Sequence, residues 1–278
     1  MIRDITLGQY FPGTSALHKA DPRIKILMAI LFIAATFAAN GTLSFILLFL
    51  SALILFLVSR ISVITVLKGL KPILFILIFT TFFQILFSRS GELLFEWYII
   101  KIYDSGIIAA AKMIVRIVVL VVSTSVLLSY TTSPIVLTDG IEGLLKPLAK
   151  IKVPIHDFAL IMSLALRFIP TLLEETEKII SAQKSRGADF SSGSLLKRAR
   201  ALIAIFIPLL ASAIRHALDL SEAMICRGYR GGDGRTRLRQ MKIRFSDIIW
   251  LTVSAAVLAA VIILNEYGIK DLIGLFGF

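Results

Sequence analysis

Long apolar stretches alternate with short charged segments along most of the chain. Five of these stretches stand out, each of 16–18 residues, at about 24–39, 42–58, 72–88, 113–130 and 248–264. Roughly 17–25 apolar residues in a helix cross the hydrocarbon core of a bilayer, and flanking residues can extend each stretch by a turn. The pattern therefore predicts an all-α polytopic membrane protein with about five transmembrane helices.

The sequence also indicates where these helices begin and turn. Asp21 and Pro22 precede the first stretch and suit the cap and the first position of a helix. Asn40 and Gly41, which are turn residues, separate the first two stretches. We therefore expect the first two transmembrane helices to form a tight hairpin.

The segment 131–245, between the fourth and fifth stretches, has a different pattern. It holds 18 of the 30 basic residues together with apolar runs at 158–173 and 201–214. We interpret it as three long amphipathic helices on the cytoplasmic membrane surface, at about 134–150, 154–186 and 194–227. If both runs crossed the bilayer, the basic segment 174–200 would lie outside, against the positive-inside tendency. A chain with seven spans remains the alternative.

Charges between the spans predict the orientation. Basic residues gather before the first stretch and between the second and third, whereas segment 89–104 carries three acidic residues against two basic ones. Because Lys and Arg mark cytoplasmic loops, the N-terminus is expected in the cytoplasm and the C-terminus outside. Segment 89–104 is then external, with Trp97, Tyr98 and Tyr103 at the level of the lipid headgroups.

These expectations divide the chain into four regions. They are a cytoplasmic N-terminal segment at 1–23, a four-span region at 24–130, a cytoplasmic coupling-helix region at 131–245, and the last span with an external tail at 246–278.

Composition narrows the class of protein. The chain is 57% apolar and only 17% charged, which excludes a soluble two-domain enzyme and a disordered chain. The net charge is +12. In a membrane protein, an excess of basic residues marks the cytoplasmic side, so we do not expect a nucleic acid partner. A single cysteine, Cys226, excludes an internal disulfide and a cysteine-based metal cluster.

The second and third amphipathic segments end alike. Each has a Phe-Ile-Pro run, at 168–170 and 206–208, and each ends in an x-Arg-Gly motif, at Ser185-Arg186-Gly187 and Cys226-Arg227-Gly228. For one copy, helix capping is a sufficient explanation, because Gly and a nearby Arg suit a helix C-terminus. Two copies on helices taken to run parallel indicate more: each arginine can bind a carboxylate of a partner bidentately.

These motifs carry a resemblance to a known family. The N-terminal residues Gly8-Gln9-Tyr10, Pro12-Gly13, Ser15, Leu17-His18, Asp21-Pro22-Arg23 and Lys25, with the paired x-Arg-Gly motifs, resemble the transmembrane T component of energy-coupling factor (ECF) transporters. Ser185 and Cys226 depart from this family's usual alanine.

The resemblance implies a scaffold subunit of a vitamin or metal-ion importer in the prokaryotic cell membrane. Its implied partners are two ABC-type ATPases, which bind ATP and Mg, and one small substrate-binding membrane protein, the S component; this chain itself would hold no cofactor and no metal. The implied ATPase-binding residues are Ser185, Arg186, Gly187, Cys226, Arg227 and Gly228. The implied S-component contacts are Ile161, Leu164, Phe168, Leu172, Leu202, Ile205 and Leu209. Asp21, Pro22, Arg23 and Lys25 form the family's N-terminal signature.

Missing motifs weigh against catalysis. The chain has no phosphate-binding loop of the G-x-x-x-x-G-K-[ST] type and no H-E-x-x-H motif, and the expected span interiors lack Asp and Glu. His18, His156 and His216 occur singly, and each is expected to be structural or on the surface and not a ligand. Lys112 and Arg116 near the fourth span are expected to reach the interface or other helices, with a substrate role as the alternative.

Two rival functions remain open. A conventional ABC permease is one, because Glu222-Ala223-Met224 with Gly228 partly matches the coupling loop of such importers. A membrane enzyme acting on lipid-linked phosphates is the other, since the basic segment 131–245 suits phosphate, although no nucleophile and base pair is visible. The transported substrate cannot be read from this sequence.

Overall fold

The computed structural model describes residues 10–88, 93–97, 100–151, 154–188, 190, 195–231, 241 and 243–275. Their contacts form two compact units. We call the described residues within Glu142–Gln240 the helix-pair unit, and those within Gly8–Ile141 and Met241–Phe278 the bundle unit.

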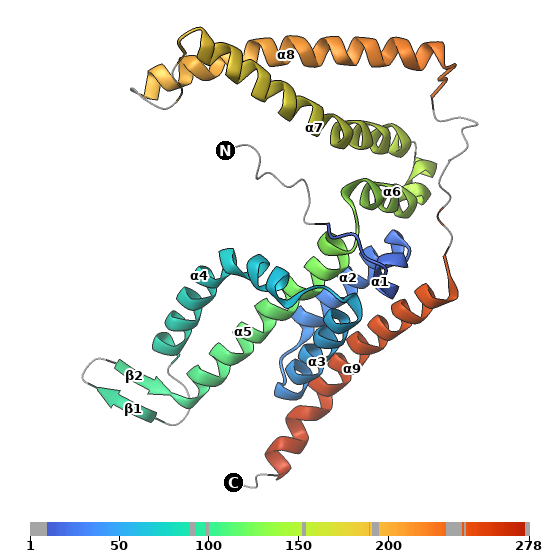
Figure 1. The fold of residues 1–278 in the computed structure, drawn as a ribbon. Coiled ribbons are helices and arrows are strands. Elements are labelled where there is room, and N and C mark those ends of the chain that lie inside the picture. Colours follow the sequence, from blue (N-terminus) through green and yellow to red (C-terminus); the bar gives the residue numbers. More distant parts are fainter. Residues whose placement is uncertain are drawn as a thin grey trace. The chain divides into compact units, whose positions relative to one another are not determined.

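The bundle unit is built from long helices (Figure 1). They are α1 (Ala16–Lys19), α2 (Pro22–Ala38), α3 (Thr42–Ser59), α4 (Val63–Phe87), α5 (Asp104–Thr124) with the π-helix η1 (Ser125–Tyr130), and α9 (Phe245–Leu275). Both α2 and α3 pack against α5 and α9, whereas α4 packs mainly against α5. Met28, Leu48, Val119 and Val261 are among the buried side chains that hold these helices together.

Local sequence explains where α2 begins. The Asp21 side chain accepts a hydrogen bond from the Arg23 N–H at 2.9 Å, and Pro22 occupies the first turn. A carboxylate at this position satisfies a backbone donor that the helix leaves unpaired. The predicted start at Asp21 and Pro22 is therefore confirmed, as is the break between α2 and α3 at Asn40 and Gly41.

Six helices of the described residues are long and apolar enough to cross a membrane. They are Thr42–Ser59, Val63–Phe87, Asp104–Tyr130, Ile155–Ser185, Ala201–Cys226 and Phe245–Glu266. The predicted helical, polytopic membrane fold is confirmed. Two of these helices, Ile155–Ser185 and Ala201–Cys226, lie in the segment predicted to stay on the cytoplasmic membrane surface. Whether the chain has five or seven spans therefore stays a prediction.

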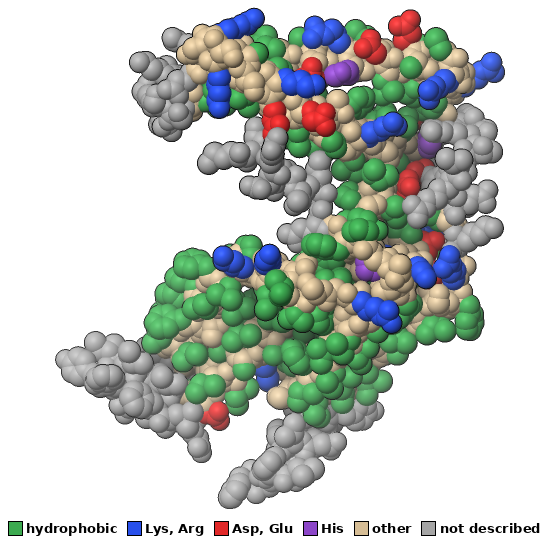
Figure 2. Space-filling view, in the orientation of Figure 1, with side chains coloured by type: hydrophobic (Ala, Val, Ile, Leu, Met, Phe, Trp, Pro, Cys, Tyr) green, Lys and Arg blue, Asp and Glu red, His purple; other side chains and the backbone are tan. Residues whose placement is uncertain are grey.

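Charge is unevenly placed on the bundle unit. Hydrophobic side chains cover most of its visible face, and most of its visible Lys and Arg gather along the end at which α1 lies (Figure 2). This separation is typical of a membrane protein with a basic cytoplasmic end.

A short hairpin is the part of the bundle unit that the helical prediction missed. Strands β1 (Leu93–Trp97) and β2 (Ile100–Tyr103) pair antiparallel, with Trp97 opposite Ile100. The run of aromatic and β-branched residues here favours strands, which is the signal that could have found it. Tyr98, expected at the headgroup level, lies outside the described residues.

The helix-pair unit consists mainly of α7 (Ile155–Ser185) and α8 (Leu195–Cys226), which follow α6 (Pro134–Leu145) and the 3-10 helix η2 (Lys146–Ile151). The predicted helices 154–186 and 194–227 are confirmed. The first predicted helix, 134–150, is wrong at its end, because α6 stops at Leu145 and η2 continues. Pro147 explains the change, since its ring disfavours an α-helical conformation at the preceding residue.

Candidate partner-docking site

Helix α7 ends in a Schellman motif at Gly187. The Ala188 N–H donates to the carbonyl of Gln183 at 3.0 Å, and the Gly187 N–H donates to that of Lys184 at 2.9 Å. Gly187 has a φ of +86°, and a Cβ added there would meet no atom within 4 Å. Backbone conformation, and not space, therefore requires glycine at this position.

Helix α8 ends in the same way at Gly228. The Tyr229 N–H donates to the carbonyl of Met224 at 3.0 Å, and the Gly228 N–H donates to that of Ile225 at 2.9 Å. The φ of Gly228 is +71°, and its surroundings are equally open. The two x-Arg-Gly motifs therefore have one backbone structure, with the arginine as the cap residue before the left-handed glycine.

Every residue of both motifs is exposed. The exposed residues are Ser185, Arg186, Gly187, Cys226, Arg227 and Gly228. In the described residues, neither Arg186 nor Arg227 has a carboxylate within salt-bridge distance in its own chain. Both arginines are thus accessible to a partner, and a guanidinium group can bind a carboxylate bidentately.

The two motifs lie at opposite ends of the helix pair (Figure 1). Gln183 contacts Ala204, Glu175 contacts Ser212, and Phe168 contacts His216, so residue numbers fall on α7 as they rise on α8. The helices are therefore antiparallel, and the expectation that they run parallel is wrong. A short connection permits only this arrangement, because consecutive helices joined by few residues turn back on each other.

The antiparallel arrangement sets a distance between the arginines. Ala204 lies opposite Gln183, near the end of α7, and Arg227 follows 23 residues further along α8. At 1.5 Å of rise per residue, the two motifs are about 35 Å apart along the pair.

A polar seam joins α7 and α8; it consists of Glu175, Gln183, Ser212 and His216. The Ser212 hydroxyl donates to Glu175 Oε1, and Glu175 Oε2 lies 3.7 Å from His216 Nδ1. The His216 ring stacks on Phe168 with centroids 6.3 Å apart. The sequence offered no sign of this seam, because it joins positions 21 to 41 residues apart on two helices.

The predicted S-component contacts differ in exposure. Ile161 and Leu202 are 63% and 62% exposed, whereas Ile205 is 8% exposed and so is not accessible. Leu164, Phe168, Leu172 and Leu209 are partly buried. Further exposed apolar residues of α8, at spacings of three and four, form a continuous face in addition to the predicted contacts: Ile203, Ile207, Leu210, Ile214 and Leu218.

The N-terminal signature forms a buried charged contact at the start of α2. Lys25 is 2% exposed, and its Nζ donates to the Thr131 carbonyl at 2.9 Å and to Thr132 Oγ1 at 3.0 Å. The carboxylates of Asp247 and Asp21 attract its charge. Asp21, Pro22, Arg23 and Lys25 therefore form the start of α2, and Lys25 ties this start to the segment that follows η1.

The segment before α2 is organised by His18. Its Nδ1 lies 2.7 Å from Ser15 Oγ and its Nε2 lies 3.0 Å from the Phe11 carbonyl. Because a carbonyl only accepts, Nε2 carries the proton and Nδ1 accepts from the Ser15 hydroxyl. A Cβ at Gly13 would come within 2.6 Å of the ring, so glycine permits this close approach. Burial, more than the charge of Lys25, lowers the pKa of His18, although its bond to Phe11 opposes the shift.

Lys112 and Arg116 contact another helix. Arg116 donates to the Ala39 carbonyl at 2.7 Å, and Lys112 donates to that of Asn40 at 3.4 Å. Asn265 Oδ1 accepts from the N–H groups of Asn40 and Gly41, both at 3.1 Å. These contacts satisfy backbone groups at the end of α2, which supports the structural reading of both cations over a substrate role.

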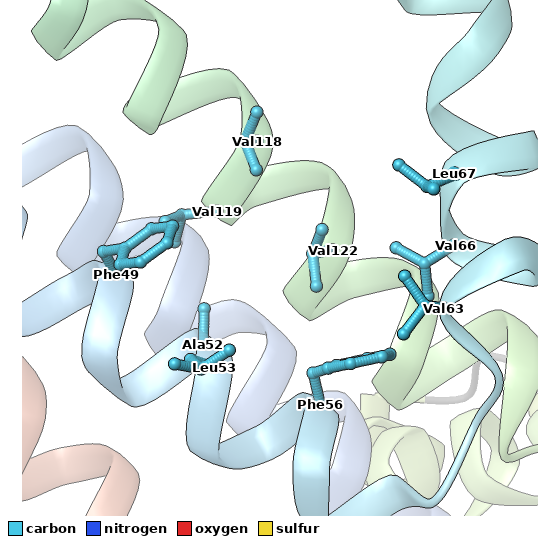
Figure 3. Close-up of a pocket in the computed structure, with 10 residues that line it drawn as sticks. All are labelled: Phe49, Ala52, Leu53, Phe56, Val63, Val66, Leu67, Val118, Val119 and Val122. Atoms are coloured by element: carbon cyan, nitrogen blue, oxygen red, sulfur yellow. The ribbon is translucent and has the colours of Figure 1, made fainter.

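One cavity of the bundle unit does not suit a small polar molecule. A cavity of about 140 Å³ between α3, α4 and α5 is lined by apolar side chains alone, including Phe49, Phe56, Val66 and Val122 (Figure 3). It offers no polar side chain to orient a ligand. Within the described part of the chain, His, Cys, Asp and Glu form no group suited to a metal ion.

Comparisons with known proteins agree with these features. A family model described as cobalt transport protein, CbiQ, matches residues 13–238. The chain is 49% identical to the energy-coupling factor transporter transmembrane protein EcfT of Ruminiclostridium cellulolyticum, over 96% of this chain and 99% of that protein. It is 47% identical to the EcfT of Clostridium kluyveri, over 96% and 98%, and 40% identical to that of Bacillus subtilis, over 95% and 97%. The chain therefore belongs to the EcfT family, the transmembrane proteins of energy-coupling factor transporters.

Proposed function

We propose that this chain is the scaffold of an ECF-type importer and transmits ATP-driven motion of two cytosolic ABC-type ATPases to a small S component. The observation that carries the proposal is the pair of identical helix ends, each with one exposed arginine beside a left-handed glycine. The chain itself supplies neither ATP hydrolysis nor a cofactor, since ATP and Mg belong to the ATPases. The imported substrate is a vitamin or a metal ion.

Each arginine docks one ATPase. A guanidinium group binds a carboxylate through two parallel hydrogen bonds, which gives direction as well as attraction. Two docking points about 35 Å apart on one helix pair suit two similar subunits that bind side by side, because each subunit then receives one helix end. Movement of the ATPases relative to each other would change the angle between α7 and α8.

The exposed apolar face of α8 receives the S component. Apolar contacts have no fixed direction, so they permit two surfaces to slide past each other in a way that hydrogen-bonded contacts resist. Leu202 and the face formed by Ile203, Ile207, Leu210, Ile214 and Leu218 supply such a surface. On α7, Ile161 supplies another exposed apolar side chain.

The proposal includes a topology in the prokaryotic cell membrane. The N-terminus and segment 131–245 lie in the cytoplasm, where ATP is available, and the C-terminus lies outside. The basic end of the bundle unit supports this orientation (Figure 2).

Isolation of the tagged chain from its native membranes tests the proposal. We expect two ABC-type ATPases and one small membrane protein to accompany it, with ATP hydrolysis in the isolated complex. A chain that is stable, isolated alone and active on a lipid-linked phosphate would overturn the scaffold function.

A further inference from the structure

One carboxylate of α7 holds one turn of α8. The Ser212 hydroxyl donates to Glu175 Oε1, and Glu175 Oε2 lies 3.7 Å from His216 Nδ1. Ser212 and His216 are four residues apart, so their side chains lie on the same face of α8. Hydrogen bonds to a carboxylate are shorter and stronger than those to a neutral acceptor. Glu175 therefore fixes α8 at one point along its length.

The packing around Glu175 strengthens this fixed point. Ser212 is 5% exposed, so its bond to the carboxylate is shielded from water. The His216 ring stacks on Phe168, with an angle of 27° between the ring planes. Side chains of both helices thus hold the contact from two sides.

A second tie between the helices is weaker. The Gln183 side-chain amide donates to the Ala204 carbonyl at 3.4 Å, which is long for a hydrogen bond between neutral groups. This tie lies eight residues from the first one on each helix, or about 12 Å along the pair. Gln183 and Ala204 are both partly exposed, so water can replace either group when the bond breaks. Breaking the second tie therefore costs less free energy than breaking the first.

Two helices that are tied at two points cannot change their angle unless one tie breaks. Around an axis through Glu175 and Ser212, a rotation of about 10° moves Gln183 away from Ala204 by about 2 Å, which is beyond hydrogen-bond distance. The same rotation moves Arg227, 15 residues from Ser212, by about 4 Å. A small change of angle therefore moves a helix end and breaks the weaker tie.

We propose that Glu175 is a positioning residue and the pivot of the helix pair, and that the bond from Gln183 to Ala204 is a latch. The latch holds α7 and α8 at one angle when it is closed. When the helix ends move, the latch breaks and the contact at the pivot is kept. The proposal rests on the scaffold function, which supplies the movement of the two helix ends.

Hydrogen exchange on the complex isolated from native membranes tests the pivot and the latch. We expect MgATP to raise exchange in segment 201–207 by about threefold to tenfold, because the bond to Ala204 breaks. Exchange in segment 210–216 should stay the same, because Ser212 and His216 keep their contact with Glu175. A rise in 210–216 would overturn the pivot, and no rise in 201–207 would overturn the latch.

A single change of charge tests the part played by Glu175. Glu175→Gln keeps the shape of the side chain and an acceptor for Ser212, but it removes the charge. With MgATP, we expect exchange to rise in 210–216 as well as in 201–207. Glu174→Gln is the matched control, since it makes the same change at an exposed neighbouring position. Equal exchange of 210–216 in the two variants would overturn the part assigned to Glu175.

Cross-linking separates the two ties in a Cys226→Ala background. A short bifunctional thiol reagent joins Gln183→Cys to Ala204→Cys at the latch, or Glu175→Cys to Ser212→Cys at the pivot. We expect the link at the latch to slow ATP hydrolysis by the complex about fivefold or more, and a reducing agent to restore it. The link at the pivot should leave the rate of its own variant unchanged. Equal inhibition by both links would overturn the proposal.

Failure of the scaffold function gives a different result. The wild-type chain would then be isolated without ATPases, and MgATP would have no effect on its exchange. The pivot would still be decided on the isolated chain, where Glu175→Gln should raise exchange in 210–216 and Glu174→Gln should not. Equal exchange in these two variants would overturn the pivot independently of the partners.

Discussion

The side-chain amide of Gln183 on α7 donates a hydrogen bond to the Ala204 carbonyl on α8, at 3.4 Å. Ala204 lies four residues before Pro208, which has no N–H and therefore cannot make the bond that a helix normally gives this carbonyl. Gln183 replaces the missing donor from the neighbouring helix. The proline in α8 thus creates an acceptor that ties the two helices together.

A double-mutant cycle tests this replacement. Gln183→Leu leaves the Ala204 carbonyl without its donor, so amide exchange in α8 around Ala204 should rise by about threefold to tenfold. Pro208→Ala restores the intrahelical N–H, and in that background Gln183→Leu should have almost no effect. Equal effects in both backgrounds would contradict the link between Gln183 and Pro208.

The left-handed glycines at the helix ends predict a second result. A left-handed conformation costs an L-residue roughly 1–2 kcal/mol, so Gly187→Ala and Gly228→Ala should reorient the neighbouring arginines. We expect about tenfold weaker capture of ATPases in the double variant, measured by titration on the immobilised chain. Ser185→Ala with Cys226→Ala alters the same motifs but leaves both left-handed glycines in place, so capture of the ATPases should be unchanged.

The native cysteine provides a test of topology and docking together. Cys226 is exposed and precedes Arg227. A membrane-impermeant thiol reagent should label it in inside-out vesicles and not in intact cells. The ATPases, when bound, should protect it. Labelling from outside would contradict the proposed cytoplasmic position of segment 131–245.

A pH dependence follows from His18. Its pKa is lowered from the ordinary value of 6.5, so the folded segment binds fewer protons than the unfolded one near that pH. The stability that neutral His18 contributes is present above pH 6.5 and is lost as the pH falls below it. Protonation also removes the acceptor for Ser15 and places a second charge near Lys25. Protection from exchange in 11–19, taken relative to the intrinsic exchange rate at each pH, should therefore fall as the pH drops below 6.5.

The control for this prediction is His18→Asn. This change removes the titrating group, so protection in the same segment should be lower than in the wild-type chain above pH 6.5 and should fall no further below it. A loss of protection at low pH that persists in the variant would assign the effect to another group.

The features that could be predicted from sequence are local. Asp21 and Pro22 specify a helix start through bonds within three residues, and the x-Arg-Gly motifs specify a helix end in the same way. The apolar length of each stretch predicted the membrane helices, because bilayer thickness sets that length.

The features that sequence did not predict join distant residues. Lys25 binds Thr131 and Thr132, 106 and 107 residues away, and no local pattern marks that pairing. The antiparallel arrangement of α7 and α8 was missed for a different reason. Two similar helix ends were taken as side by side, although the short connection between the helices places them at opposite ends.

Charge reversal at both helix ends is the most direct test of the account. Arg186→Glu with Arg227→Glu should release both ATPases from the purified chain while the chain stays folded in the membrane. Lys184→Glu with Arg230→Glu is the matched control, since it makes the same change in charge at exposed neighbouring positions outside the motifs. We predict that only the first variant loses the ATPases in a pull-down; retention of both ATPases by that variant would contradict docking through these arginines.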